Sequence, residues 1–131
     1  MNITELMTDR VATVSMDDPL SVVKNAFDNS RFHHLLVVDA DVLVGVISDR
    51  DLLKAMSPFL GTAAEVRRDI QTIAQPVHKI MTRKLVTLGP EAQLQDAISV
   101  FKEQQISCIP IVDGIGQPIG IVSWRDIMKT L

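Results

Sequence analysis

The chain has 131 residues, of which 47% are hydrophobic and 22% charged, as in one ordinary globular domain. Its single cysteine, Cys108, excludes a disulfide scaffold and a cysteine-built zinc site. The net charge of −3 and the short apolar runs exclude a broad basic surface and a membrane-spanning helix, so we expect no nucleic acid and no membrane insertion. The N-terminus lacks the features of a secretory signal, and we expect a cytoplasmic protein.

The first part of the chain predicts four elements. Leu20, Val23 and Phe27 share one side of a helix. Two β-rich runs then flank Ala40 and Asp41, a pattern typical of a tight hairpin turn. In order, the predicted elements are a helix over 19–29, strands over 35–39 and 42–48, and a closing helix over 50–56.

A linking segment over residues 57–76 follows. Thr62 and Glu65 have the spacing of a capping box, and Pro76 ends the segment. The apolar residues between them are spaced as on one face of a helix: Val66, Ile70 and Ile73. We therefore expect this link to be helical.

The second part of the chain has the same order of elements. Leu94, Ala97, Ile98 and Phe101 form one apolar stripe. The predicted elements are a helix over 91–103, strands over 108–113 and 118–123, and a closing helix over 125–131.

The two parts are repeats of one another. A displacement of 74 positions places Met7 and Thr8 on Met81 and Thr82, and one extra residue in the second copy makes the displacement 75 after residue 114. Twelve identities result, and most other aligned positions stay apolar. We expect a first repeat at 1–56, a link at 57–76 and a second repeat at 77–131. A repeat of about 55 residues is marginal alone, so both should pack about a pseudo-twofold axis into one module.

Paired motifs connect these repeats with a known family. The strings Ile109-Pro110-Ile111-Val112-Asp113 and Gly120-Ile121-Val122-Ser123-x-x-Asp126 resemble those of a cystathionine β-synthase (CBS) domain. Residues 6–8 and 45–52 carry the counterparts in the first repeat. The chain thus resembles a stand-alone tandem CBS pair, or Bateman module. The resemblance implies an α+β (α/β-like) fold of two βαββα-type repeats.

The resemblance also implies binding rather than catalysis. CBS pairs typically hold AMP, ADP, ATP or S-adenosylmethionine as regulatory ligands in clefts between their repeats, and need no catalytic cofactor. It further implies a homodimer formed through helices, and leaves room for an unidentified protein target.

The family's ligand positions map onto both repeats. The Ser-x-x-Asp signature matches Ser48 with Asp51 and Ser123 with Asp126, where a carboxylate can accept both ribose hydroxyls. From the pseudo-twofold pairing we expect Asp126 to share a cleft with Thr13, and Asp51 to share one with Thr87. The remaining implied ligand-binding residues are Phe32, His33, His34 and Arg50 in the first repeat, and Ile106, Ser107, Cys108 and Arg125 in the second. Two departures from the family pattern are Leu36, where the second copy has Pro110, and Asp49, which adds negative charge.

Each of these residues also has a purely structural interpretation. Asp51 and Asp126 suit the first turn of a helix, and Thr13 and Thr87 suit a strand. His33 and His34 are adjacent on a predicted strand and point to opposite faces, so we expect no metal site. Cys108 is flanked by apolar residues and reads as a core or cleft-wall residue rather than a nucleophile.

Three functional hypotheses follow. The first is a regulatory sensor of an adenosine-containing ligand. The second is a ligand-independent module that dimerises or docks on an enzyme, transporter or kinase. The third is an enzyme, which the lack of a nucleophile–base pair, metal cluster or phosphate-transfer loop in the sequence disfavours.

Overall fold

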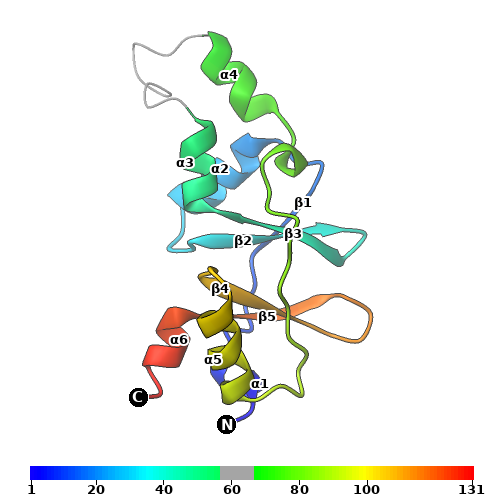
Figure 1. The fold of residues 1–131 in the computed structure, drawn as a ribbon. Helices are drawn as coiled ribbons and strands as arrows, with labels where there is room; N and C mark the ends of the chain where they lie inside the picture. Colours follow the sequence, from blue (N-terminus) through cyan, green and yellow to red (C-terminus); the bar gives the residue numbers. More distant parts are fainter. Residues whose placement is uncertain (57–66) are drawn as a thin grey trace. The chain divides into compact units, whose positions relative to one another are not determined.

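The computed structural model describes residues 1–56 and 67–131, whose contacts divide them into two compact units. Unit 1 comprises Met1–Val11, Ala40–Leu43 and Leu85–Leu131, and unit 2 comprises Ala12–Asp39 and the described part of Val44–Lys84. Helices accompany two small sheets, so the fold class is α+β, as the sequence predicts (Figure 1).

A three-stranded sheet with the order β1-β2-β3 is the centre of unit 2. Its first two strands run parallel, with Thr13 opposite Leu36. The hairpin turn between β2 and β3 lies at Ala40 and Asp41, whose φ angles of 49° and 68° are those of a tight two-residue turn. The elements are β1 (Thr13–Ser15), α2 (Leu20–Asp28), β2 (His34–Asp39), β3 (Val42–Ser48), α3 (Asp49–Ala55), α4 (Arg67–Ala74) and η1 (Val77–Lys79).

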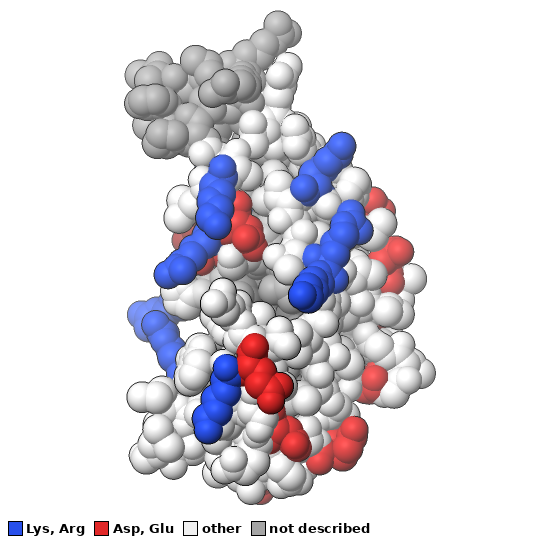
Figure 2. Space-filling model, in the orientation of Figure 1, with Lys and Arg blue, Asp and Glu red and all other residues white. Residues whose placement is uncertain are grey.

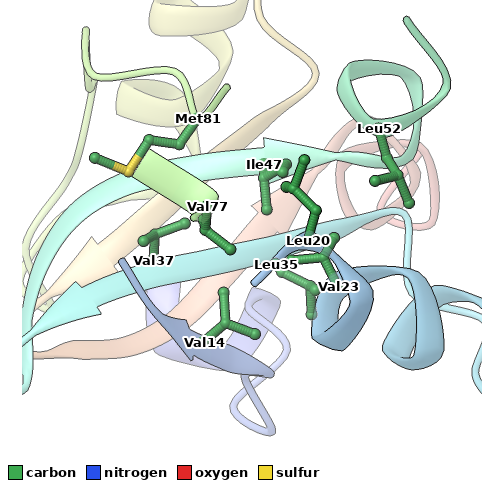
Figure 3. Packing of buried hydrophobic residues seen from close by; sticks show 9 residues of the cluster. All are labelled: Val14, Leu20, Val23, Leu35, Val37, Ile47, Leu52, Val77 and Met81. Carbon is green, nitrogen blue, oxygen red and sulfur yellow. The ribbon is translucent and has the colours of Figure 1, made fainter. Parts of the chain in front are cut away.

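The core of unit 2 lies between this sheet and its helices. Alternate residues of β3 are buried, as expected for a strand with one face against a core. Figure 3 shows the apolar side chains converging from strands, helices and η1: Val14, Leu20, Val23, Leu35, Val37, Ile47, Leu52, Val77 and Met81.

Unit 1 contains a two-stranded antiparallel sheet and three helices. Cys108 of β4 lies opposite Ser123 of β5. The N–H of Leu43 donates to the carbonyl of Gly116 (3.0 Å), which attaches the hairpin tip to this unit. The elements are α1 (Ile3–Leu6), α5 (Leu94–Glu103), β4 (Cys108–Val112), β5 (Pro118–Ser123) and α6 (Trp124–Met128), and the core residues are Ile3, Ala97, Phe101, Ile109, Ile111, Val122 and Ile127.

The opening segments of the two repeats are exchanged. Thr8 and Ile121 of unit 1 exchange two backbone hydrogen bonds, of 2.9 and 3.0 Å. Thr82 and Val46 of unit 2 do the same, at 2.8 and 3.1 Å. Each unit therefore combines the body of one sequence repeat with the opening segment of the other.

Some element bounds differ from the predicted ones. Helix α5 begins at Leu94 rather than at 91, because the N–H of Gln93 donates to the carboxylate of Asp96 (2.8 Å) and makes Gln93 the cap. Helix α6 ends at Met128, where the hydroxyl of Thr130 donates to the carbonyl of Ile127 (2.7 Å). The link is helical over α4, whereas Thr62, Glu65 and Val66 lie outside the described residues.

Candidate ligand-binding site

The first Ser-x-x-Asp motif forms the junction between β3 and α3. The N–H of Ser48 donates to Oδ2 of Asp51 (2.9 Å), and the N–H of Asp51 donates to Oγ of Ser48 (3.1 Å). This is a reciprocal capping arrangement, which satisfies two backbone donors at the helix start. Asp51 thus has a structural role in capping α3, and this role occupies one of its two carboxylate oxygens.

The second motif forms the matching junction between β5 and α6. The N–H of Ser123 donates to Oδ2 of Asp126 (2.8 Å), and the Ser123 hydroxyl lies 3.2 Å from the same oxygen. Within the described residues, no hydrogen bond engages Oδ1 of Asp51 or of Asp126. Each carboxylate therefore keeps one oxygen for a hydroxyl donor.

Two histidines lie beside the first motif. The Nδ1 atom of His33 is 3.0 Å from Oδ2 of Asp49, and the N–H of Asp49 donates to the carbonyl of His33 (3.0 Å). Burial lowers the pKa of His34, although Asp49 and Asp51 raise it in part. The structure thus brings residues 33 and 34 to the start of α3.

The other candidate residues divide between the units. In unit 2, Phe32 and Arg50 are exposed. In unit 1, Ile106 is half-buried, and Ser107 and Arg125 are exposed. We call Phe32, His33, His34, Ser48, Arg50 and Asp51 the unit 2 group, and Ile106, Ser107, Cys108, Ser123, Arg125 and Asp126 the unit 1 group.

Two threonines complete the predicted set. Thr13 is exposed on β1, and Thr87 is half-buried just before the Leu88–Ile111 bridge. Thr13 belongs to unit 2 and Thr87 to unit 1, so their pairing with Asp126 and Asp51 stays a prediction.

Cys108 occupies an apolar position in β4. Its side chain is buried, and burial raises the pKa of the thiol to about 12. At neutral pH the group is therefore a protonated thiol, which is a poor nucleophile.

Sequence reasoning missed two contacts. Asp49 was singled out only for its added charge, yet it contacts His33 directly. Trp124, at the matching position of the second repeat, has its ring centroid 4.9 Å from that of Phe101. One sequence signal could have pointed to both residues. Asp49 and Trp124 each follow the Ser of a Ser-x-x-Asp motif and are the first residues of the helices α3 and α6 beside the candidate site.

The described residues contain no group of three or more metal-ligating side chains suited to an ion. None of their helices is long and apolar enough to cross a membrane. Acidic and basic side chains both reach the face drawn in Figure 2.

Comparison with known proteins identifies the family. The CBS domain model matches residues 3–58 and 77–131, a tandem of two such domains. The chain belongs to the CBS domain family. A CBS domain-containing protein of Dictyostelium discoideum is 31% identical over 129 residues, which are 97% of this chain and 88% of that protein.

Solved structures share the fold. CBSX2, in complex with AMP, has a TM-score of 0.79 at 24% identity, covering 98% of this chain and 94% of its own. The CBS domain pair of protein MJ0100, in complex with 5′-methylthioadenosine and S-adenosylmethionine, has a TM-score of 0.77 at 23% identity, covering 99% and 94%.

Proposed function

We propose that this chain is a non-catalytic sensor that binds an adenosine-containing ligand at the unit 1 and unit 2 groups. The observation that carries the proposal is that both Ser-x-x-Asp motifs adopt the same local structure, in which the N–H of the Ser donates to Oδ2 of the Asp. In each, capping occupies Oδ2 of the aspartate and holds the side chain in place, while Oδ1 remains for a ribose hydroxyl. AMP, 5′-methylthioadenosine and S-adenosylmethionine in structures of like fold support the ligand class.

Isothermal titration calorimetry with AMP, ATP and S-adenosylmethionine tests this proposal. We expect at least one compound to bind, and the Asp51→Asn/Asp126→Asn variant to lose roughly tenfold in affinity, because each substitution removes a charged acceptor. The amides retain an oxygen for the Ser48 and Ser123 N–H groups, so the caps are kept. Absence of binding by all three compounds would refute the proposal.

The response to ligand requires a partner, and the surface of α6 together with the last residue, Leu131, supports one. Trp124, Met128 and Leu131 are 47%, 60% and 89% exposed, at helical intervals. Apolar side chains gathered in this way favour association. We propose that a second copy of the chain covers them, in a homodimer whose arrangement the ligand shifts.

Light scattering with chromatography measures that association. Met128→Glu should lower the mass from dimer to monomer, whereas Lys129→Glu, at the C-cap of the same helix, should leave it unchanged. A dimer that persists in Met128→Glu argues against the surface. A dimer indifferent to every ligand would favour the alternative function, a ligand-independent interaction module.

A further inference from the structure

Asp49 ties the start of α3 to the start of β2 through two contacts. Its carboxylate lies 3.0 Å from Nδ1 of His33, and its N–H donates to the His33 carbonyl. Both side chains remain half exposed, at 42% and 55%. The pair therefore lies at the surface, next to Ser48 and two residues before Asp51.

The charges of this region follow from its contacts. Partial burial raises the pKa of Asp49, but the hydrogen bond with His33, the N–H of Arg50 and the nearby imidazoles outweigh it, and the net pKa lies below the ordinary value. Asp49 is thus ionised at neutral pH. Burial keeps His34 largely uncharged there. Arg50 is the one permanent cation of the unit 2 group, and two carboxylates, those of Asp49 and Asp51, flank it in the sequence.

The unit 1 group has a different balance. Trp124 stands at the position of Asp49, and Ser107 and Cys108 stand at those of the histidines. Arg125 and Asp126 then carry opposite single charges. The unit 2 group thus has beside it one carboxylate that the unit 1 group lacks, and that carboxylate also contacts the imidazole of His33, one of the implied ligand-binding residues.

We propose that Asp49 is a specificity-determining residue, which makes the unit 2 group select adenosyl ligands whose 5′ substituent is uncharged or cationic over polyphosphates. The inference rests on the proposed function and names the ligand class of one of its two sites. A polyphosphate near Asp49 is repelled by its charge and competes with it for His33, whereas adenosine meets neither obstacle. The unit 1 group, without this carboxylate, accepts either class.

Each group has its own spectroscopic reporter. Trp124 is the only tryptophan and lies within the second Ser-x-x-Asp motif, so its emission follows the unit 1 group. The imidazole NMR signals of His33 and His34 follow the unit 2 group. Both are recorded during titrations of the full chain with adenosine and with ATP, in EDTA so that no divalent cation neutralises the phosphates. Because Trp124 also belongs to the proposed dimer surface, each titration is repeated in the Met128→Glu background, where a change in association cannot contribute to the emission.

The test compares wild type with Asp49→Asn, which keeps an acceptor for His33 and removes the charge. We expect the histidine signals to respond to adenosine at lower concentration than to ATP. Asp49→Asn should tighten ATP binding about tenfold there and leave adenosine binding nearly unchanged. Asp39→Asn makes the same charge change at the opposite end of β2 and should change neither affinity. The Trp124 response to ATP should be the same in all variants.

The outcomes separate the two proposals. An equal ratio of ATP to adenosine affinity in wild type and Asp49→Asn, or histidine signals that respond to neither ligand while Trp124 responds, overturns the role of Asp49 and leaves the sensor function. No response at either reporter overturns the sensor function itself. Wild type gives a check that needs no variant. Added salt screens the charge of Asp49, so it should reduce the difference between the affinities for adenosine and for ATP that the histidine signals report. A gap independent of salt contradicts the proposal.

Discussion

Met81 lies directly against Gly45, where β3 passes the opening segment of the second repeat. A Cβ on Gly45 would be 2.6 Å from the Met81 sulfur and 3.1 Å from the carbonyl oxygen of Thr82. That carbonyl accepts a hydrogen bond from Val46, so it is fixed in place. Gly120 receives Met7 in the same way in unit 1. The glycine and methionine of each pair come from different repeats.

Gly45→Ala should therefore destabilise unit 2 by about 1–3 kcal/mol, because the added methyl group overpacks a site bounded by fixed backbone. Urea denaturation measures the change in the free energy of unfolding. Gly114→Ala is the matched control, since a Cβ there meets nothing within 4 Å. Equal stability of the two variants would contradict the steric account.

The pH dependence of stability should reflect His34. Burial holds its pKa below the ordinary 6.5 in the folded state, so the unfolded chain binds the proton first as the pH falls. The free energy of unfolding should thus be highest above pH 6.5. It should decrease as the pH falls from 6.5 to the folded-state pKa of His34. Denaturation at several pH values between 7.5 and 5.5 measures this slope.

Two variants assign that slope. His34→Gln should reduce it, whereas His78→Gln, which removes another histidine of unit 2, should retain more of it. Asp49 acts in the same sense at lower pH, because its lowered pKa gives stability above pH 3.8 that is lost on further acidification. A slope unchanged in His34→Gln would show that His34 is not its source.

Cys108 should react slowly with thiol reagents in the folded protein. Its pKa of about 12 leaves only about one thiolate in ten thousand at pH 8, and its burial limits access. A disulfide reagent that releases a coloured thiolate gives the rate. In urea one thiol per chain should react quickly, since Cys108 is the only cysteine. Rapid reaction of the native chain would show that β4 opens readily.

Asp51 should affect stability and binding separately. Asp51→Ala removes the acceptor of the Ser48 N–H, which is one half of the capping box of α3, and should cost about 1 kcal/mol of stability. Asp51→Asn keeps an oxygen for the Ser48 N–H and should cost less. Both should weaken adenosine binding if Oδ1 holds the ribose. Weakened binding in Asp51→Ala alone would assign the aspartate a structural role only.

Much of the fold follows from local sequence. The hairpin of β2 and β3 is predicted because Ala40 and Asp41 separate two β-rich runs, and the junction at Ser48 because Asp51 suits the first turn of a helix directly after a β-rich run. The start of α5 was harder to predict. Pro90 and Glu91 suit a first turn, but the Gln93–Asp96 cap decides the start through a side chain whose conformation the sequence does not give.

One difference between the repeats has a chemical reason that the sequence contains. The N–H of Leu36 donates to the Ala12 carbonyl (3.1 Å) in the parallel pairing of β1 and β2. Its counterpart, Pro110, has no N–H, and the second repeat keeps only the Leu88–Ile111 bridge. The difference between Leu36 and Pro110 thus affects the pairing of strands in the sheet.

The candidate site was only partly predictable. Both Ser-x-x-Asp motifs were recognised through the resemblance to the family, and the structure gives them the capping geometry that the alternative interpretation required. The His33–Asp49 contact could not be foreseen, because it joins residues sixteen positions apart and depends on the hairpin register.

The exchanged opening segments bear on the order in which the protein is synthesised. Unit 2 is complete once Lys84 has left the ribosome, but Met1–Val11 belongs to the unit that needs Leu85–Leu131. At about 5–20 residues per second, Ile3 and Met7 wait roughly 6–24 s for the strand and helices that bury them. Residues 1–11 are therefore made well before the residues that cover them, and a nascent chain exposes Ile3 and Met7, which chaperones can bind, until Leu85–Leu131 has been made.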